Sequence, residues 1–147
     1  LGRGAVEDVY DESYRFELGK GRVLKEGKKV ALVATGMMVQ EALKAADILA
    51  KEDISVTVVD MPCIKPIDEE LIENIAKSHE LIITCEEHNV YGGLGSAVSE
   101  VTSKKSPLRM EMIGMQDTFG ESGMPNELLV KYGLNAESIV EKVNKCL

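Results

Sequence analysis

The sequence contains no long uninterrupted hydrophobic run and no cluster of basic residues. No apolar run approaches the roughly 20 residues that a helix needs to cross a bilayer, and residues 1–20 are too polar for a secretory signal peptide. The net charge is −8, whereas nucleic acids and anionic membranes are bound through clustered Lys and Arg. We therefore expect neither nucleic acid nor a membrane among the partners of this chain.

Cysteine and histidine are scarce. The three cysteines, Cys63, Cys85 and Cys146, lack the spacing of metal ligands, and their odd number does not indicate a disulfide framework. We interpret them as reduced thiols of a cytoplasmic protein. A metal site needs three or more ligands, and His79 and His88 are the only histidines, so no metal site is predicted. His79 precedes a strand and is expected to be exposed.

The pattern that is present is an alternation of buried strands and amphipathic helices. The 147 residues correspond in length to one domain. Strands are expected over 22–25, 30–35, 54–60, 81–86 and 109–113. Helices are expected over 38–51, 126–132 and 136–145, the last with Asn135 as N-cap; two further helices are expected to begin after an N-cap at Asp68 and at Gly95. The segment 103–107 is expected to be a loop. This order predicts an α/β fold with a mostly parallel sheet and helices on both faces, in which strand 22–25 is an antiparallel edge strand.

The first residues carry little periodicity. Residues 1–19 are interpreted as a linker that arrives from elsewhere, followed by a domain over 20–147. The chain starts with Leu1 and not with Met, so we expect it to be processed, trimmed or cut from a longer protein.

Three chemically active side chains, Glu86, Glu87 and His88, directly follow the central strand. If strand 30–35 lies between 54–60 and 81–86, the winding reverses there, and Thr35-Gly36-Met37 meets these residues at the carboxyl edge where α/β sheets bind ligands and partners. The three side chains could act as acids, bases or metal ligands. The favoured alternative is that they cap the following helix or form bonds across a subunit interface.

A glycine-rich turn, Gly92-Gly93-Leu94-Gly95, follows the acidic residues. Its backbone N–H groups could bind an anion at a helix N-terminus, but the turn matches neither the dinucleotide-binding fingerprint nor the P-loop. Close approach of the backbone to a neighbouring element or a partner is the favoured interpretation of Gly92, Gly93 and Gly95. No Ser, Cys or Thr is spaced as a nucleophile with its base, so these residues alone predict no reaction.

Several short motifs occur in a characteristic order over nearly the whole chain. They are Gly19-Lys20-Gly21, Leu24-Lys25-Glu26-Gly27, Ala34-Thr35-Gly36, Ile64-Lys65-Pro66-Ile67-Asp68, Glu86-Glu87-His88 with Gly92-Gly93-Leu94-Gly95, and Gly114 with Asp117 and Glu121-Ser122-Gly123. Together they resemble the C-terminal domain of the transketolase family of thiamine-diphosphate enzymes. The Glu-Glu-His and Gly-Gly-Leu-Gly-Ser-Ala-Val segments are most similar to the branch of transketolase and 1-deoxyxylulose-5-phosphate synthase.

The resemblance implies a three-layer α/β/α domain with a mixed five-stranded sheet and one antiparallel edge strand. It also implies that the domain follows a pyrimidine-binding domain, helps to hold a homodimer together, and contributes Glu86, Glu87, His88 and the turn glycines to an interface or to the edge of the active site. The segment Leu1-Gly2-Arg3-Gly4 is similar to the end of the pyrimidine domain of the family, where an arginine binds the phosphate of the sugar substrate. Arg3 would fill that role with its planar guanidinium, and an ordinary linker arginine is the alternative.

The resemblance further implies a parent enzyme that transfers ketol units between sugar phosphates with thiamine diphosphate and Mg. The cofactor signature of the family, which begins Gly-Asp-Gly and ends in paired asparagines, does not occur here. The chain alone is therefore expected to bind no cofactor and to have no catalytic residue. Two alternatives remain open: the equivalent domain of a 2-oxoacid dehydrogenase β subunit, and a free-standing flavodoxin-like binding or regulatory module.

Overall fold

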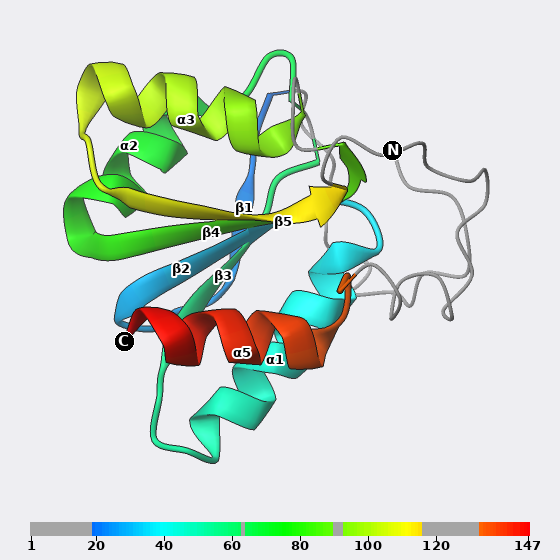
Figure 1. The fold of residues 1–147 in the computed structure, drawn as a ribbon. Coiled ribbons are helices and arrows are strands. Elements are labelled where there is room, and N and C mark those ends of the chain that lie inside the picture. The colour runs from blue at the N-terminus through cyan, green and yellow to red at the C-terminus, as the bar shows by residue number, and fades with distance from the viewer. Residues whose placement is uncertain (1–18, 63, 90–92, 116–132) are drawn as a thin grey trace, which may run out of the picture.

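A computed structural model describes residues 19–62, 64–89, 93–115 and 133–147 of the chain. In this part, strands and helices alternate (Figure 1). The strands are β1 (Arg22–Lys25), β2 (Lys29–Ala34), β3 (Val56–Asp60), β4 (His79–Asn89) and β5 (Arg109–Met115). The helices are α1 (Met38–Ala50), α2 (Glu69–Ser78), α3 (Leu94–Lys105) and α5 (Ala136–Cys146).

The strands form one five-stranded sheet in the order β1-β3-β2-β4-β5. β1 pairs antiparallel with β3 at one edge, while the other pairs are parallel. This confirms the predicted mixed sheet with an antiparallel edge strand. It also places β2 between β3 and β4, so the winding reverses at β2 as expected.

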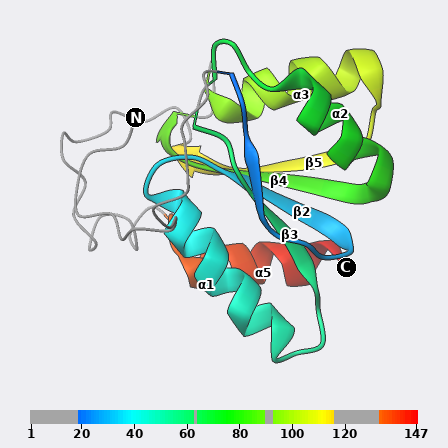
Figure 2. The same ribbon diagram turned by 180° about the vertical axis from the view of Figure 1, so that it is seen from behind.

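Helices cover both faces of the sheet: α1 and α5 lie on one face, and α2 and α3 lie on the other (Figures 1 and 2). Successive side chains of β2 point alternately to the two faces. Val30, Leu32 and Ala34 pack in the core under α1 and α5, and Ala31 and Val33 pack in the core under α2 and α3. β2 is therefore apolar on both faces, which is the pattern of a central parallel strand.

Asp68 joins the beginning of the described chain to α2. Its Oδ1 accepts a hydrogen bond from the N–H of Leu71 at 3.1 Å, which is the predicted N-cap. Its Oδ2 accepts the N–H of Gly21 at 3.0 Å. A side chain at Gly21 would collide with Met61 and Leu71, so this glycine allows the backbone before β1 to approach α2 closely.

Two expectations were wrong. The segment 103–107 is not all loop, because α3 continues to Lys105. No glycine or proline lies between Gly95 and Pro107 to end the helix earlier. His79 is half-buried and not simply exposed. Its ring contacts Thr57 Oγ1 at 2.7 Å through Nε2 and the carbonyl oxygen of Ile75 at 2.9 Å through Nδ1. His79 therefore links α2 to β3.

The strand expected over 22–25 is found with these ends as β1, and the other expected elements are found with shifted ends. The helix expected over 126–132 and nearly all of the proposed linker lie outside the described residues. Asn135 caps α5 as expected, since its Oδ1 accepts the N–H of Ser138 at 2.9 Å.

In the described ranges, no helix has both the length and the apolar character required to cross a membrane.

We expect Asp68→Ala to lower the free energy of unfolding by about 2 kcal/mol, because both the α2 cap and the bond to Gly21 are lost. Urea denaturation of the chain measures this change. Glu70→Ala, in the same first turn but exposed, is the control and should change stability by no more than about 0.5 kcal/mol. Equal effects of the two substitutions would contradict the double role of Asp68.

Candidate functional site

The carboxyl ends of the central strands bring two loops together. Ala34, the last residue of β2, pairs with Cys85 of β4, and the N–H of Thr35 donates to the carbonyl oxygen of Cys85 at 3.2 Å. The turn through Gly36, whose φ is +60°, then leads into α1. The predicted meeting of the Thr35-Gly36 turn with the Glu86-Glu87 segment therefore occurs, and we call this region the carboxyl edge.

Glu86 binds the N-terminus of α3 with both carboxylate oxygens. Oε1 accepts the N–H of Leu94 at 3.1 Å, and Oε2 accepts the N–H of Gly95 at 2.9 Å. The side chain is fully buried. A helix N-terminus carries unpaired N–H groups and a positive dipole end, and here the anion that meets them is supplied by the chain itself. The prediction that the acidic segment caps the following helix is therefore confirmed for Glu86.

Gly95 lies where α3 approaches the sheet most closely. A Cβ atom at this position would stand 2.7 Å from Met112 Sδ and 3.0 Å from Thr84 Oγ1. Both distances are shorter than ordinary van der Waals contact, so a larger residue would push α3 away from β4 and β5. The interpretation of the turn as a close backbone approach is correct for Gly95, and the neighbour is an element of the same domain.

The neighbouring Cys85 thiol is enclosed in the core. Burial, with a smaller contribution from the charge of Glu86, raises the pKa of Cys85 from its ordinary value of 9.0 to about 12. Cys85 is therefore a neutral thiol near neutral pH, and it behaves as a small hydrophobic residue and not as a nucleophile.

The structure describes only some of the other predicted site residues. Glu87 is 8% exposed at the same edge, and Gly93 is the N-cap residue of α3. His88 belongs to β4, but its side chain lies outside the described residues, as do Gly92 and Arg3. Their assigned roles stay predictions.

Asp60 is a buried carboxylate at this edge that the sequence reasoning did not select. It ends β3, pairs with Ala34 and is 7% exposed. Its position as the last residue of an apolar strand is the feature of the sequence that could have identified it as a candidate. Within the described ranges, no three His, Cys, Asp or Glu side chains are grouped so that they could hold a metal ion, although Asp60 and Glu86 both lie at the carboxyl edge.

Comparison with known proteins identifies relatives along nearly the whole chain. The family model described as "Transketolase, C-terminal domain" matches residues 19–139. A putative transketolase C-terminal section from Methanocaldococcus jannaschii is 43% identical over 144 residues, which cover 96% of this chain and 45% of that protein. A 1-deoxy-D-xylulose-5-phosphate synthase from Neisseria gonorrhoeae is 42% identical over 147 residues, which cover 99% of this chain and 22% of that enzyme.

A solved structure agrees with these matches. It is described as "Split gene transketolase, inactive beta4 tetramer" and is 49% identical in sequence, with a TM-score of 0.90 over 97% of this chain and 47% of that one. The chain thus spans less than half the length of these relatives. Their names fall in the branch to which the motifs were most similar.

We expect Glu86→Gln to lower the free energy of unfolding by about 3 kcal/mol. The amide oxygen of glutamine can accept a hydrogen bond from one of the two N–H groups, those of Leu94 and Gly95. The amide NH₂ group would face the other N–H, so one buried hydrogen bond is lost and two donors oppose each other. Chemical denaturation measures the change. The matched control is Glu100→Gln, at an exposed position of α3, for which a change within about 0.5 kcal/mol is expected; similar losses for both would show that the bonds to α3 contribute little.

The raised pKa of Cys85 predicts a loss of stability at alkaline pH. Below pH 9.0 the thiol is neutral in both states; between 9.0 and about 12 it ionises only in the unfolded chain. Unfolding is then favoured by up to about 1.4 kcal/mol per pH unit. Denaturation of the chain and of Cys85→Ala from about pH 8 to about pH 10 checks this: the variant should lose stability less steeply, and parallel slopes would contradict the assignment.

Proposed function

Because the chain belongs to the family of transketolase C-terminal domains, we propose that it is the C-terminal domain or subunit of a transketolase-like thiamine-diphosphate enzyme. The observation that carries this proposal is the coverage: 96% of this chain aligns to only 45% of a relative that is itself named a C-terminal section. The other part of the enzyme would contain the cofactor-binding domains, in the same polypeptide or in a separate one.

The proposed reaction of the complete enzyme is the transfer of ketol units between sugar phosphates, with thiamine diphosphate as the cofactor. The names of the relatives, transketolase and 1-deoxy-D-xylulose-5-phosphate synthase, support this branch over that of the dehydrogenase β subunits. We assign the assembly to the cytoplasm, in keeping with the interpretation of the cysteines as reduced thiols.

The described residues do not fit the metal–diphosphate group of such an enzyme. No cluster of ligands for a metal is present among them, and the buried Glu86 carboxylate is bonded to the backbone of α3. We therefore assign no step of the reaction to this part of the chain. Its proposed contribution is to hold the subunits together and to place the carboxyl edge at an interface or at the edge of the active site. The residues proposed for this role are Glu86, Glu87, His88, Gly92, Gly93 and Gly95.

The proposed assembly is a homodimer of complete units, each containing this section. The similar solved structure, of which this chain covers 47%, is described as an inactive tetramer. That description supports the proposal that a chain containing this domain self-associates and is inactive without its partner. Arg3 is proposed to bind the substrate phosphate, and residues 1–19 to connect the domain over 20–147 to what precedes it.

The test is a reconstitution of the enzyme from its parts. Ketol transfer between sugar phosphates is measured with this chain alone, with the section that carries the cofactor-binding domains alone, and with both together, and light scattering gives the mass of each sample. We expect activity and a dimer of complete units only in the mixture. Activity of either part alone, equal to that of the mixture, would refute the proposal.

The same assay tests Arg3. We expect Arg3→Gln to raise the KM for the phosphorylated substrate by about tenfold with an unchanged assembly mass, because the charge-assisted bond to phosphate is lost. Lys20→Gln, which removes one positive charge nearby in the sequence, is the control and should leave the KM unchanged. An unchanged KM in Arg3→Gln would place Arg3 outside the substrate site.

A further inference from the structure

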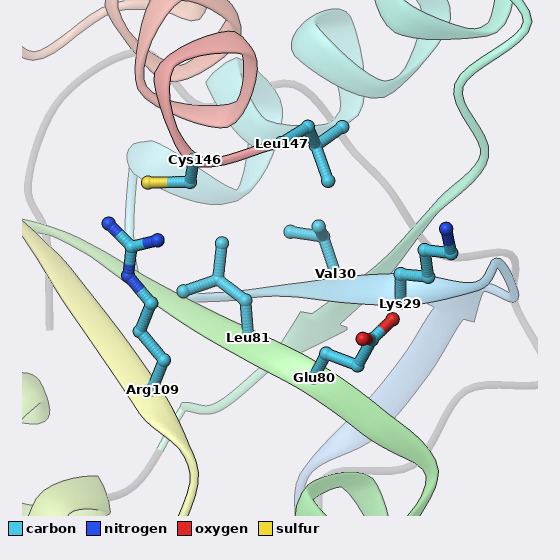
Figure 3. Close-up of a pocket in the computed structure, with 7 residues that line it drawn as sticks. All are labelled: Lys29, Val30, Glu80, Leu81, Arg109, Cys146 and Leu147. Atoms are coloured by element: carbon cyan, nitrogen blue, oxygen red, sulfur yellow. The ribbon is translucent and has the colours of Figure 1, made fainter.

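A pocket of about 380 Å³ lies at the opposite end of the strands from the carboxyl edge (Figure 3). It forms where β2, β4 and β5 begin and where α5 ends. Its lining residues are Lys29, Val30, Glu80, Leu81, Arg109, Cys146 and Leu147. The volume falls in the range of about 300–1,000 Å³ that is typical of small-molecule sites.

The pocket has an apolar middle and charged sides. Val30 and Leu81 are almost completely buried, at 1% and 4% exposed, and they lie between Arg109 on one side and Lys29 with Glu80 on the other (Figure 3). A ligand that fills this pocket would thus meet aliphatic side chains along its body and a cation at its end.

The backbone at this end of the sheet is irregular in a way that shapes the pocket. Lys29 has a φ of +64°, a value that L-residues with long side chains seldom adopt. The N–H of Val30 donates to the carbonyl oxygen of Lys28 at 2.7 Å, which closes a tight turn around Lys29. The register between β2 and β4 also shifts here, so Glu80 is an extra residue between the pairs Lys29–His79 and Val30–Leu81. Such bulges redirect side chains next to functional sites. Residues other than glycine with a left-handed backbone conformation are also enriched at functional sites.

The charged side chains that line the pocket are the cations Lys29 and Arg109 and the anion Glu80. Arg109 Nη2 lies 3.7 Å from Glu111 Oε2, but the other oxygen of Glu111 lies 3.6 Å from Lys142 Nζ. One carboxylate is therefore shared by two cations, with long distances to both. Within the described ranges, Lys29 forms no ion pair, so its ammonium group stays available beside the pocket.

We propose that this pocket binds a small organic anion that combines an apolar body with a carboxylate or phosphate group. The anionic group lies against the Arg109 guanidinium, which can donate two parallel hydrogen bonds to either group, and Lys29 adds a second positive charge. The apolar body packs on Val30 and Leu81. Because the pocket lies at the opposite end of the strands from the carboxyl edge, which is proposed to face the active site, it would be a second site.

The test is a titration of the chain with benzoate and with phenyl phosphate, followed through the backbone amide NMR signals. We expect saturable shifts of Val30, Leu81 and Cys146 with a Kd below about 1 mM for at least one of the two anions, and the tighter one identifies the preferred head group. Benzyl alcohol, acetate and inorganic phosphate each lack one half of the proposed ligand and should bind at least about tenfold more weakly.

Two variants assign the binding to the two cations. Arg109→Gln and Lys29→Asn should each weaken binding, by about tenfold for Arg109, and asparagine suits the left-handed backbone at position 29, so the fold is retained. Lys104→Gln removes an exposed cation of α3 and should bind like the original chain. Absence of saturable shifts up to about 10 mM of either anion, equal binding of benzyl alcohol, or undiminished binding by Arg109→Gln would each overturn the proposal.

Discussion

The buried carboxylate of Glu86 is the group on which the carboxyl edge depends. A fully buried charge is costly unless every oxygen is hydrogen-bonded, and the two N–H donors at the start of α3 meet that requirement at 3.1 and 2.9 Å. The same bonds fix α3 against the end of β4. The helix and the strand therefore hold each other in place through this carboxylate.

Close approach of backbone is the recurring means by which the layers are joined. At Gly21 and Gly95 a Cβ atom would collide with side chains, and at Gly27 it would collide with the backbone of Val56. These glycines belong to motifs that resemble the transketolase C-terminal domain. In this chain, three of the motif glycines thus lie at close packing contacts.

The two ends of the parallel strands differ in chemistry. At the carboxyl edge, buried carboxylates such as Asp60 and Glu86 lie among turns and a helix N-terminus. At the other end, Lys29 and Arg109 flank an apolar pocket. A domain that works within a larger assembly can present one end to its partners and leave the other end for a separate ligand, because the rigid sheet between them keeps the two apart.

The sequence by itself determined the order and type of the elements, since apolar runs of β-branched residues and helical spacing are local patterns that hold in any context. The caps at Asp68 and Asn135 were readable for the same reason. Only the tertiary structure decided which N–H groups Glu86 would meet, that His79 would bridge α2 and β3, and that Lys29, Arg109 and Cys146 would line one pocket. Glu86 contacts residues eight and nine positions away, whereas the other contacts include residues distant in the chain. No local pattern specifies the strand register, the bulge at Glu80 or the position of α5 that bring them together.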